Sequence, residues 1–151
     1  METFIQCGSA FVGCLGFSLI FRVHKHLRFA IVGSVIGTIG WLIYLMCNPL
    51  NNAVIQSFIA MIGVSFMAEI MARVYKAPAT IFIMIGFFPL VPGSGIYYTM
   101  LYAVQGQQAL FADSLLTTLG IGIAIALAIL IMSTVFQVYR RIKNKDYLEA
   151  Q

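Results

Sequence analysis

The sequence predicts an all-α integral membrane protein with five transmembrane helices, and three observations support this fold class. The 151 residues are 61% hydrophobic and only 9% charged, whereas about one residue in four is charged in a soluble domain. The apolar residues fall into five stretches close to the 20 or so residues that a helix needs to cross a bilayer. All nine lysines and arginines fall between or after these stretches, at positions that share one side of a five-span bundle.

The five predicted spans follow one another with short connections and form a single transmembrane domain, residues 1–151. The first apolar stretch has no basic region ahead of it, so we expect a retained span and not a signal peptide. The predicted spans cover residues 4–21, 30–47, 53–71, 79–104 and 115–138, and a basic tail follows at 139–151.

The basic residues also predict the orientation, because short cytoplasmic loops of membrane proteins are enriched in lysine and arginine. The connections at 22–29 and 72–78 and the tail hold every basic residue, and the connections at 48–52 and 105–114 hold none. We therefore expect the N-terminus outside and the C-terminus in the cytoplasm. Positive charge placed at span ends in this way orients a membrane protein, and it argues against a nucleic-acid partner.

The second span carries Gly33 and Gly37 in a GxxxG arrangement. Small residues four apart let another helix backbone approach closely in lipid, so this face is predicted to be a packing face. The sequence leaves open whether the neighbouring helix belongs to this chain or to a partner.

The fourth span is interrupted between Pro89 and Gly95, where two prolines and two glycines fall within seven residues. Proline removes a backbone donor and clashes with the preceding turn, so the span is predicted to consist of two half-helices. Broken helices at membrane depth occur where they are buried in protein or line a polar cavity. The break is therefore the predicted functional region, although a purely structural kink explains the same pattern.

A second half-helix that starts near the break would direct free backbone N–H groups into it. Such helix N-termini bind carboxylates in secondary transporters, which predicts a small carboxylate-bearing substrate. The candidate substrate-path residues are Pro89, Pro92, Gly93, Ser94, Gly95, Tyr97 and Tyr98.

Two acidic residues, Glu69 and Asp113, are candidates for a structural or functional role. Glu69 precedes Arg73 by one turn, so the sequence is consistent with an ion pair that fixes the end of the third span. Alternatively, Glu69 is a candidate for proton coupling, because ionisable groups within spans often mark transport paths. Asp113 is predicted to be the N-cap of the fifth span.

No pattern for enzymatic chemistry or cofactor binding is present. The sequence has no nucleophile elbow, HExxH pair or phosphate-binding loop, so we expect neither an enzyme nor a cofactor. Cys7, Cys14 and Cys47 are expected to be small core residues, and the spacing of His24 and His26 does not suit a helical metal site.

Two motifs resemble a known family. The first motif is Arg73-Val74-Tyr75-Lys76-Ala77-Pro78-Ala79, and the second is Pro89-Leu90-Val91-Pro92-Gly93. Together they are similar to the C-terminal half of the threonine/serine exporter family. This half also occurs as a separate small membrane subunit, and the sequence-level signal covers residues 67–98.

The resemblance implies export of small amino acids across a bacterial inner membrane, driven by the proton motive force. It also implies a larger partner subunit that supplies the other half of the transporter. Some two-subunit relatives are associated with dicarboxylate export, in particular of succinate. The sequence is also compatible with a structural subunit that does not transport and with a passive channel.

Overall fold

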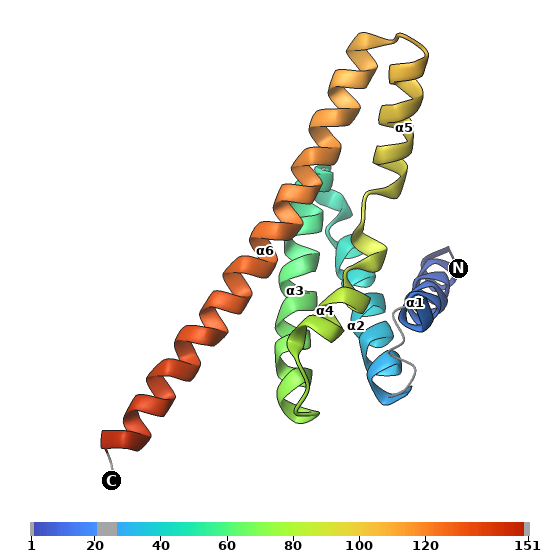
Figure 1. Cartoon of the computed structure of the whole chain (residues 1–151). Coiled ribbons are helices and arrows are strands. Elements are labelled where there is room, and N and C mark those ends of the chain that lie inside the picture. Colours follow the sequence, from blue (N-terminus) through green and yellow to red (C-terminus); the bar gives the residue numbers. More distant parts are fainter. Residues whose placement is uncertain (1, 21–26, 150–151) are drawn as a thin grey trace.

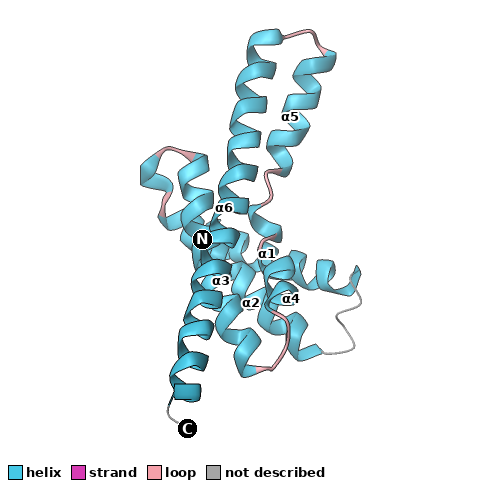
Figure 2. Ribbon diagram, turned by 60° about the vertical axis from the view of Figure 1, so that its left-hand side comes forward, coloured by secondary structure: helices cyan, strands magenta, loops and turns pink. Residues whose placement is uncertain are grey.

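The computed structural model describes residues 2–20 and 27–149, with side chains as far as residue 142. Every regular element in these residues is a helix (Figure 2). The predicted loop residues Arg22, His24, Lys25 and His26, and the side chains of Lys143 and Lys145, lie outside this described part. The elements are α1 (Glu2–Ile20), α2 (Leu27–Met46), the 3₁₀ turn η2 (Asn48–Leu50), α3 (Ala53–Val74), α4 (Ala79–Gly86), the 3₁₀ turn η3 (Phe88–Leu90), α5 (Gly93–Val104) and α6 (Gln108–Glu149).

Four of these helices, α1, α2, α3 and α6, are long and apolar enough to cross a membrane. Together, α4 and α5 make a fifth candidate span that is bent by 41°. The described chain is thus all-helical with four or five candidate spans. Helix α1 crosses α2 instead of running alongside it, as Figures 1 and 2 show.

Local chemistry explains where two of the helices begin. The side chain of Asn52 caps α3, and its Oδ1 accepts hydrogen bonds from the backbone N–H groups of Val54 at 3.0 Å and Ile55 at 3.3 Å. Helix α4 begins after Pro78, whose backbone is extended with φ −62° and ψ 133°. The fixed φ of proline and its missing donor suit the residue that precedes a helix.

The start of the last helix differs from the prediction. Helix α6 begins at Gln108 and not near residue 115, so the predicted connection at 105–114 is reduced to a short turn in which Gly106 has a positive φ of 70°. Asp113 therefore lies inside α6, and the prediction that it caps this helix was wrong. Ala109, Leu110 and Phe111 continue the apolar helix ahead of Asp113, which explains why the helix starts earlier.

The glycines of α2 form the packing centre of the bundle, as the GxxxG spacing predicted. A Cβ added at Gly37 would lie 3.3 Å from the Cα of Gly86 in α4 and 2.7 Å from the Sγ of Cys14 in α1. A Cβ at Gly33 would meet Ile85 of α4 at 2.9 Å. The close neighbours of this stripe therefore belong to the same chain, and the missing side chains let α2 hold α1 and α4 at once.

The fourth span is interrupted in the region that the sequence predicted, but the break begins after Gly86 and ends before Gly93, so Gly93, Ser94 and Gly95 belong to α5. Helix α4 ends at Gly86, η3 makes one tight turn that contains Pro89, and α5 starts at Gly93. Val91, which precedes Pro92, is extended with ψ 127°, because a residue before proline is disfavoured in the helical region. The ring of Phe88 stacks on Phe17 of α1 with 4.6 Å between centroids, so the interrupted segment is held against the bundle.

Beyond the break, α5 and the first half of α6 form an antiparallel hairpin that extends past the turn between α2 and α3 (Figures 1 and 2). The start of α2, the turn between α3 and α4, and the end of α6 all lie at the opposite end of the molecule in Figure 1. These three places carry the described basic residues Arg28, Arg73, Lys76, Arg140 and Arg141.

Replacing Gly37 by alanine should destabilise the bundle, because the added Cβ would overlap with the backbone of Gly86 and with Cys14. Overpacking of this kind costs about 1–3 kcal/mol. Gly16→Ala is the matched control, since a Cβ there meets no described atom within 4 Å. Thermal unfolding in detergent should show a lower midpoint for Gly37→Ala alone, and equal midpoints would contradict the close packing of α2.

Candidate functional site

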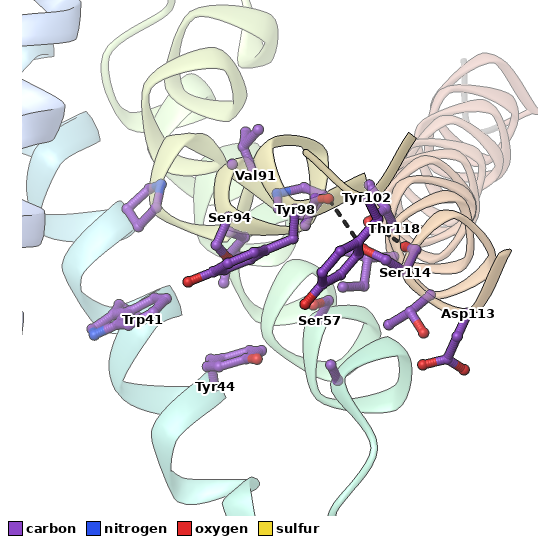
Figure 3. A pocket seen from close by; sticks show the side chains of 18 of the residues that line it. Trp41, Tyr44, Ser57, Val91, Ser94, Tyr98, Tyr102, Asp113, Ser114 and Thr118 are labelled. Atoms are coloured by element: carbon purple, nitrogen blue, oxygen red, sulfur yellow. Dashed lines mark hydrogen bonds between the residues drawn. The ribbon is translucent and has the colours of Figure 1, made fainter. Parts of the chain in front are cut away.

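A cavity of about 660 Å³ lies at the base of the hairpin, where the interrupted span faces the ends of α2 and α3 (Figure 3). Four helices and the break contribute to it, so it depends on the whole fold. Its walls are formed by Trp41 and Tyr44 of α2, Ala53 and Ser57 of α3, residues 89–95, Tyr98 and Tyr102 of α5, and Leu110, Asp113, Ser114, Thr117, Thr118 and Ile121 of α6.

Most of the predicted site residues meet in this cavity. Two do not: Tyr97, which is 63% exposed on α5, and Glu69, which lies on α3 away from the cavity wall. The predicted residues that line the cavity are Pro89, Pro92, Gly93, Ser94, Gly95 and Tyr98.

The N-terminus of α5 opens into this cavity with unpaired donors. Pro92 has φ −76° and ψ 62°, which is an inverse γ-turn, and the N–H of Gly93 donates to the carbonyl of Val91 at 2.7 Å. Among the described residues, the backbone N–H groups of Ser94 and Gly95 have no acceptor, and no side chain caps the helix. Two donors and the positive end of the helix dipole are therefore available to an anion.

A cluster of hydroxyl groups holds α5 against α6. The hydroxyl of Thr99 donates to the carbonyl of Gly95 at 2.7 Å and lies 2.9 Å from the hydroxyl of Ser114. Thr118 follows Ser114 by one turn, and a Cβ on Gly95 would lie 2.5 Å from its Oγ1. The small size of Gly95 lets the helices touch, and the contact fixes the α5 N-terminus on the cavity wall.

Aromatic rings cover two walls of the cavity. Trp41 and Tyr44 of α2 stack with 5.2 Å between centroids and 14° between planes, and Tyr98 and Tyr102 of α5 stack at 6.1 Å and 25°. Figure 3 shows Tyr98 above this α2 pair. The faces of such rings attract cations, and the hydroxyls of tyrosine add polar contacts.

Asp113 of α6 is the one acidic residue that lines the cavity, and its exposed side chain lies at the edge of the site (Figure 3). The sequence analysis predicted Asp113 to be a helix cap because it expected the last helix to begin near residue 115, whereas α6 begins at Gln108. The polar and aromatic cavity residues that the sequence did not predict are Trp41, Tyr44, Ser57, Tyr102, Asp113, Ser114, Thr117 and Thr118. An i, i+4 spacing of Ser114 and Thr118 is visible in the sequence, but their proximity to Gly95 requires the fold.

The ion pair considered for Glu69 does not form within the described structure. Arg73 instead places its guanidinium over the ring of Phe136 in α6, with 4.6 Å from Cζ to the centroid. Its Nε and one terminal nitrogen are buried without a hydrogen-bond partner. Arg73 thus has a partner on a neighbouring helix, α6, which the spacing of residues within α3 could not predict. Glu69 itself is half-buried on α3.

Comparison with known proteins gives one match. The family model described as "Threonine/Serine exporter, ThrE" matches residues 6–135, which is most of the chain and includes every residue of the cavity wall. No curated protein and no solved structure matches.

The close contact between α5 and α6 predicts that two cysteines introduced there will form a disulfide. The variant with Thr99→Cys and Ser114→Cys should oxidise readily, because the two γ-atoms lie 2.9 Å apart in the native pair and a disulfide needs closely apposed side chains. Counting maleimide-reactive thiols by mass before and after oxidation measures it. Tyr97→Cys with Ser114→Cys is the control, since Tyr97 is largely exposed and this pair should keep its thiols. Loss of thiols from both pairs would contradict this hairpin geometry.

Proposed function

The chain belongs to the threonine/serine exporter family, and on that premise we propose that it is the small subunit of a secondary transporter that exports threonine and serine. We place this transporter in the bacterial inner membrane. The observation that supports the proposal most directly is the cavity at the break, which combines free helix N–H groups, hydroxyls, aromatic rings and one carboxylate.

The carboxylate of the amino acid has a suitable partner in the α5 N-terminus. The N–H groups of Ser94 and Gly95 are unpaired, and an anion at a helix N-terminus is favoured by these donors and by the dipole. Discontinuous helices bind substrate carboxylates in this way in secondary transporters. We therefore assign the carboxylate of the substrate to the backbone of Ser94 and Gly95.

The ammonium group of the amino acid has a suitable partner in Asp113. Since this is the one charged side chain of the cavity wall, the wall is anionic at α6 and electropositive at the start of α5. A zwitterion matches both ends, whereas the second carboxylate of succinate would meet Asp113 unfavourably. The charge arrangement thus favours an amino acid over a dicarboxylate as the substrate.

A larger partner subunit completes the proposed transporter. The cavity lies at the base of a hairpin whose outer side chains are strongly exposed, with Val104 at 88% and Leu116 at 70%. A five-span unit ends on the side opposite its start, so a partner half of inverted topology would give the inverted repeats found in many secondary transporters. Their substrate sites lie at the interface between the repeats.

Glu69 is the proposed proton carrier. It is a half-buried carboxylate on α3 that forms no ion pair among the described residues, and acidic groups within spans often carry protons in transporters. Its separation from the cavity wall divides the two tasks: Asp113 contacts the substrate and Glu69 couples export to the proton gradient.

Efflux from cells that make this chain, the larger subunit, both or neither tests the proposal. Labelled threonine and serine should leave only the cells that make both, and a protonophore should stop this export. Succinate efflux would identify a dicarboxylate exporter. Protonophore-resistant efflux down a gradient would indicate a channel. If the larger subunit alone exports threonine, this chain is a structural subunit.

Substitution of the two carboxylates should have different effects. Asp113→Asn should lower threonine export relative to succinate export by about threefold, because an exposed charge pair contributes about 0.2–1 kcal/mol. Glu69→Gln is the matched comparison and should leave this ratio unchanged while it removes the dependence of export on the proton gradient. Initial efflux rates with and without protonophore measure both effects. The assignment of the two carboxylates would be contradicted if Asp113→Asn removed the dependence on the proton gradient and Glu69→Gln changed the threonine-to-succinate ratio.

A further inference from the structure

We infer that Ser57 contacts the side-chain hydroxyl of the exported amino acid and thereby sets the preference for threonine over apolar amino acids of the same size. The inference rests on the proposed function, since it places the substrate in the cavity at the break. It adds a specificity-determining residue on a third helix, α3, to the partners of the substrate carboxylate and ammonium.

The burial of Ser57 makes its hydroxyl unusual. The residue is 2% exposed and lines the cavity from the second turn of α3 (Figure 3). Within the described residues, its hydroxyl has no hydrogen-bond partner. Several helical hydroxyls in the described residues donate to a carbonyl one turn earlier, as Ser34 does to Ala30 at 2.8 Å and Thr118 does to Ser114 at 2.7 Å.

The Oγ atom of Ser57 is not among the fully enclosed unpaired atoms, unlike that of Ser65, so this hydroxyl is open to the cavity and its hydrogen-bonding capacity is directed there. The partner of Ser57 must therefore come from the contents of the cavity. A hydroxyl both donates and accepts, so it pairs well with a second hydroxyl, and threonine and serine carry one in their side chains. A bound amino acid can supply the missing hydrogen bond.

The three polar parts of the substrate then face three different helices. The carboxylate lies at the start of α5, the ammonium lies near Asp113 of α6, and the side chain points to α3. The rest of the α3 wall is apolar at Ala53, so the Ser57 hydroxyl is the polar group that this helix contributes to the cavity. An apolar pocket discriminates weakly between a methyl and a hydroxyl group, whereas a site that hydrogen-bonds the hydroxyl rejects the analogue that lacks it.

The test compares threonine with valine, which has a methyl group in place of the hydroxyl and nearly the same shape. Cells that make the chain with its larger subunit are loaded with both labelled amino acids, and the ratio of the initial efflux rates is measured. In Ser57→Ala the threonine-to-valine ratio should fall by about three- to tenfold, the range that one net hydrogen bond represents. Ser57→Thr keeps a hydroxyl and should keep the preference.

Ser65→Ala is the matched control. Ser65 lies on the same helix, is 1% exposed and also has an unpaired hydroxyl, but it does not line the cavity. Its substitution should leave the ratio unchanged. If Ser57→Ala does not reach the membrane, Ser57→Cys keeps the size of the side chain with a much weaker hydrogen-bonding group and should show the same fall in ratio.

An unchanged ratio in a transporting Ser57→Ala or Ser57→Cys variant would overturn the inference and leave the proposed function intact. An equal fall in Ser65→Ala would also overturn it, because the effect would then come from the packing of α3. Absence of threonine efflux with the unmodified chain and its larger subunit would instead reject the proposed function, and the inference with it.

Discussion

The interruption of the fourth span is the constraint on which the rest of the structure depends. Backbone donors and acceptors freed by Pro89 and Pro92 must be satisfied or placed beside a polar space, because lipid offers them no partner. The bundle encloses the interruption from several sides. Phe17 of α1 stacks on η3, the glycine stripe of α2 allows α4 to approach, and the hydroxyls of α6 fix the start of α5. The donors that remain unpaired at Ser94 and Gly95 face the cavity.

The cavity distributes different chemistry over different helices. Helix α5 presents backbone donors, α6 presents a carboxylate and hydroxyls, α2 presents stacked aromatic rings, and α3 presents one buried hydroxyl. A site assembled in this way is sensitive to the relative positions of its helices, since a shift of one helix removes one type of contact and leaves the others. This sensitivity suits a transporter, which must hold its substrate in one arrangement of helices and release it in another.

The sequence allowed much of the fold and part of the site to be predicted. The break and the glycine stripe were predictable because proline geometry and the absence of a Cβ act locally and in few ways. The start of α6 was misplaced because Asp113 resembles a cap, while the apolar residues before it continue the helix. Trp41, Tyr44 and Ser57 gave no local signal, because they face the cavity only once α2 and α3 have packed. The contact of Arg73 with Phe136 likewise joins two segments that are far apart in the sequence.

The length of α6 has a mechanical consequence. Its 42 residues form a continuous helix of about 63 Å, roughly twice the thickness of the hydrocarbon core of a bilayer. One end carries the hydroxyl cluster beside the cavity, and the other lies at the opposite end of the molecule, where the described basic residues gather. Such a helix acts as a lever: a tilt of about 5° displaces one end relative to the other by roughly 5 Å, about one helical turn. A change in the tilt of α6 would therefore move the residues at both ends of the helix together.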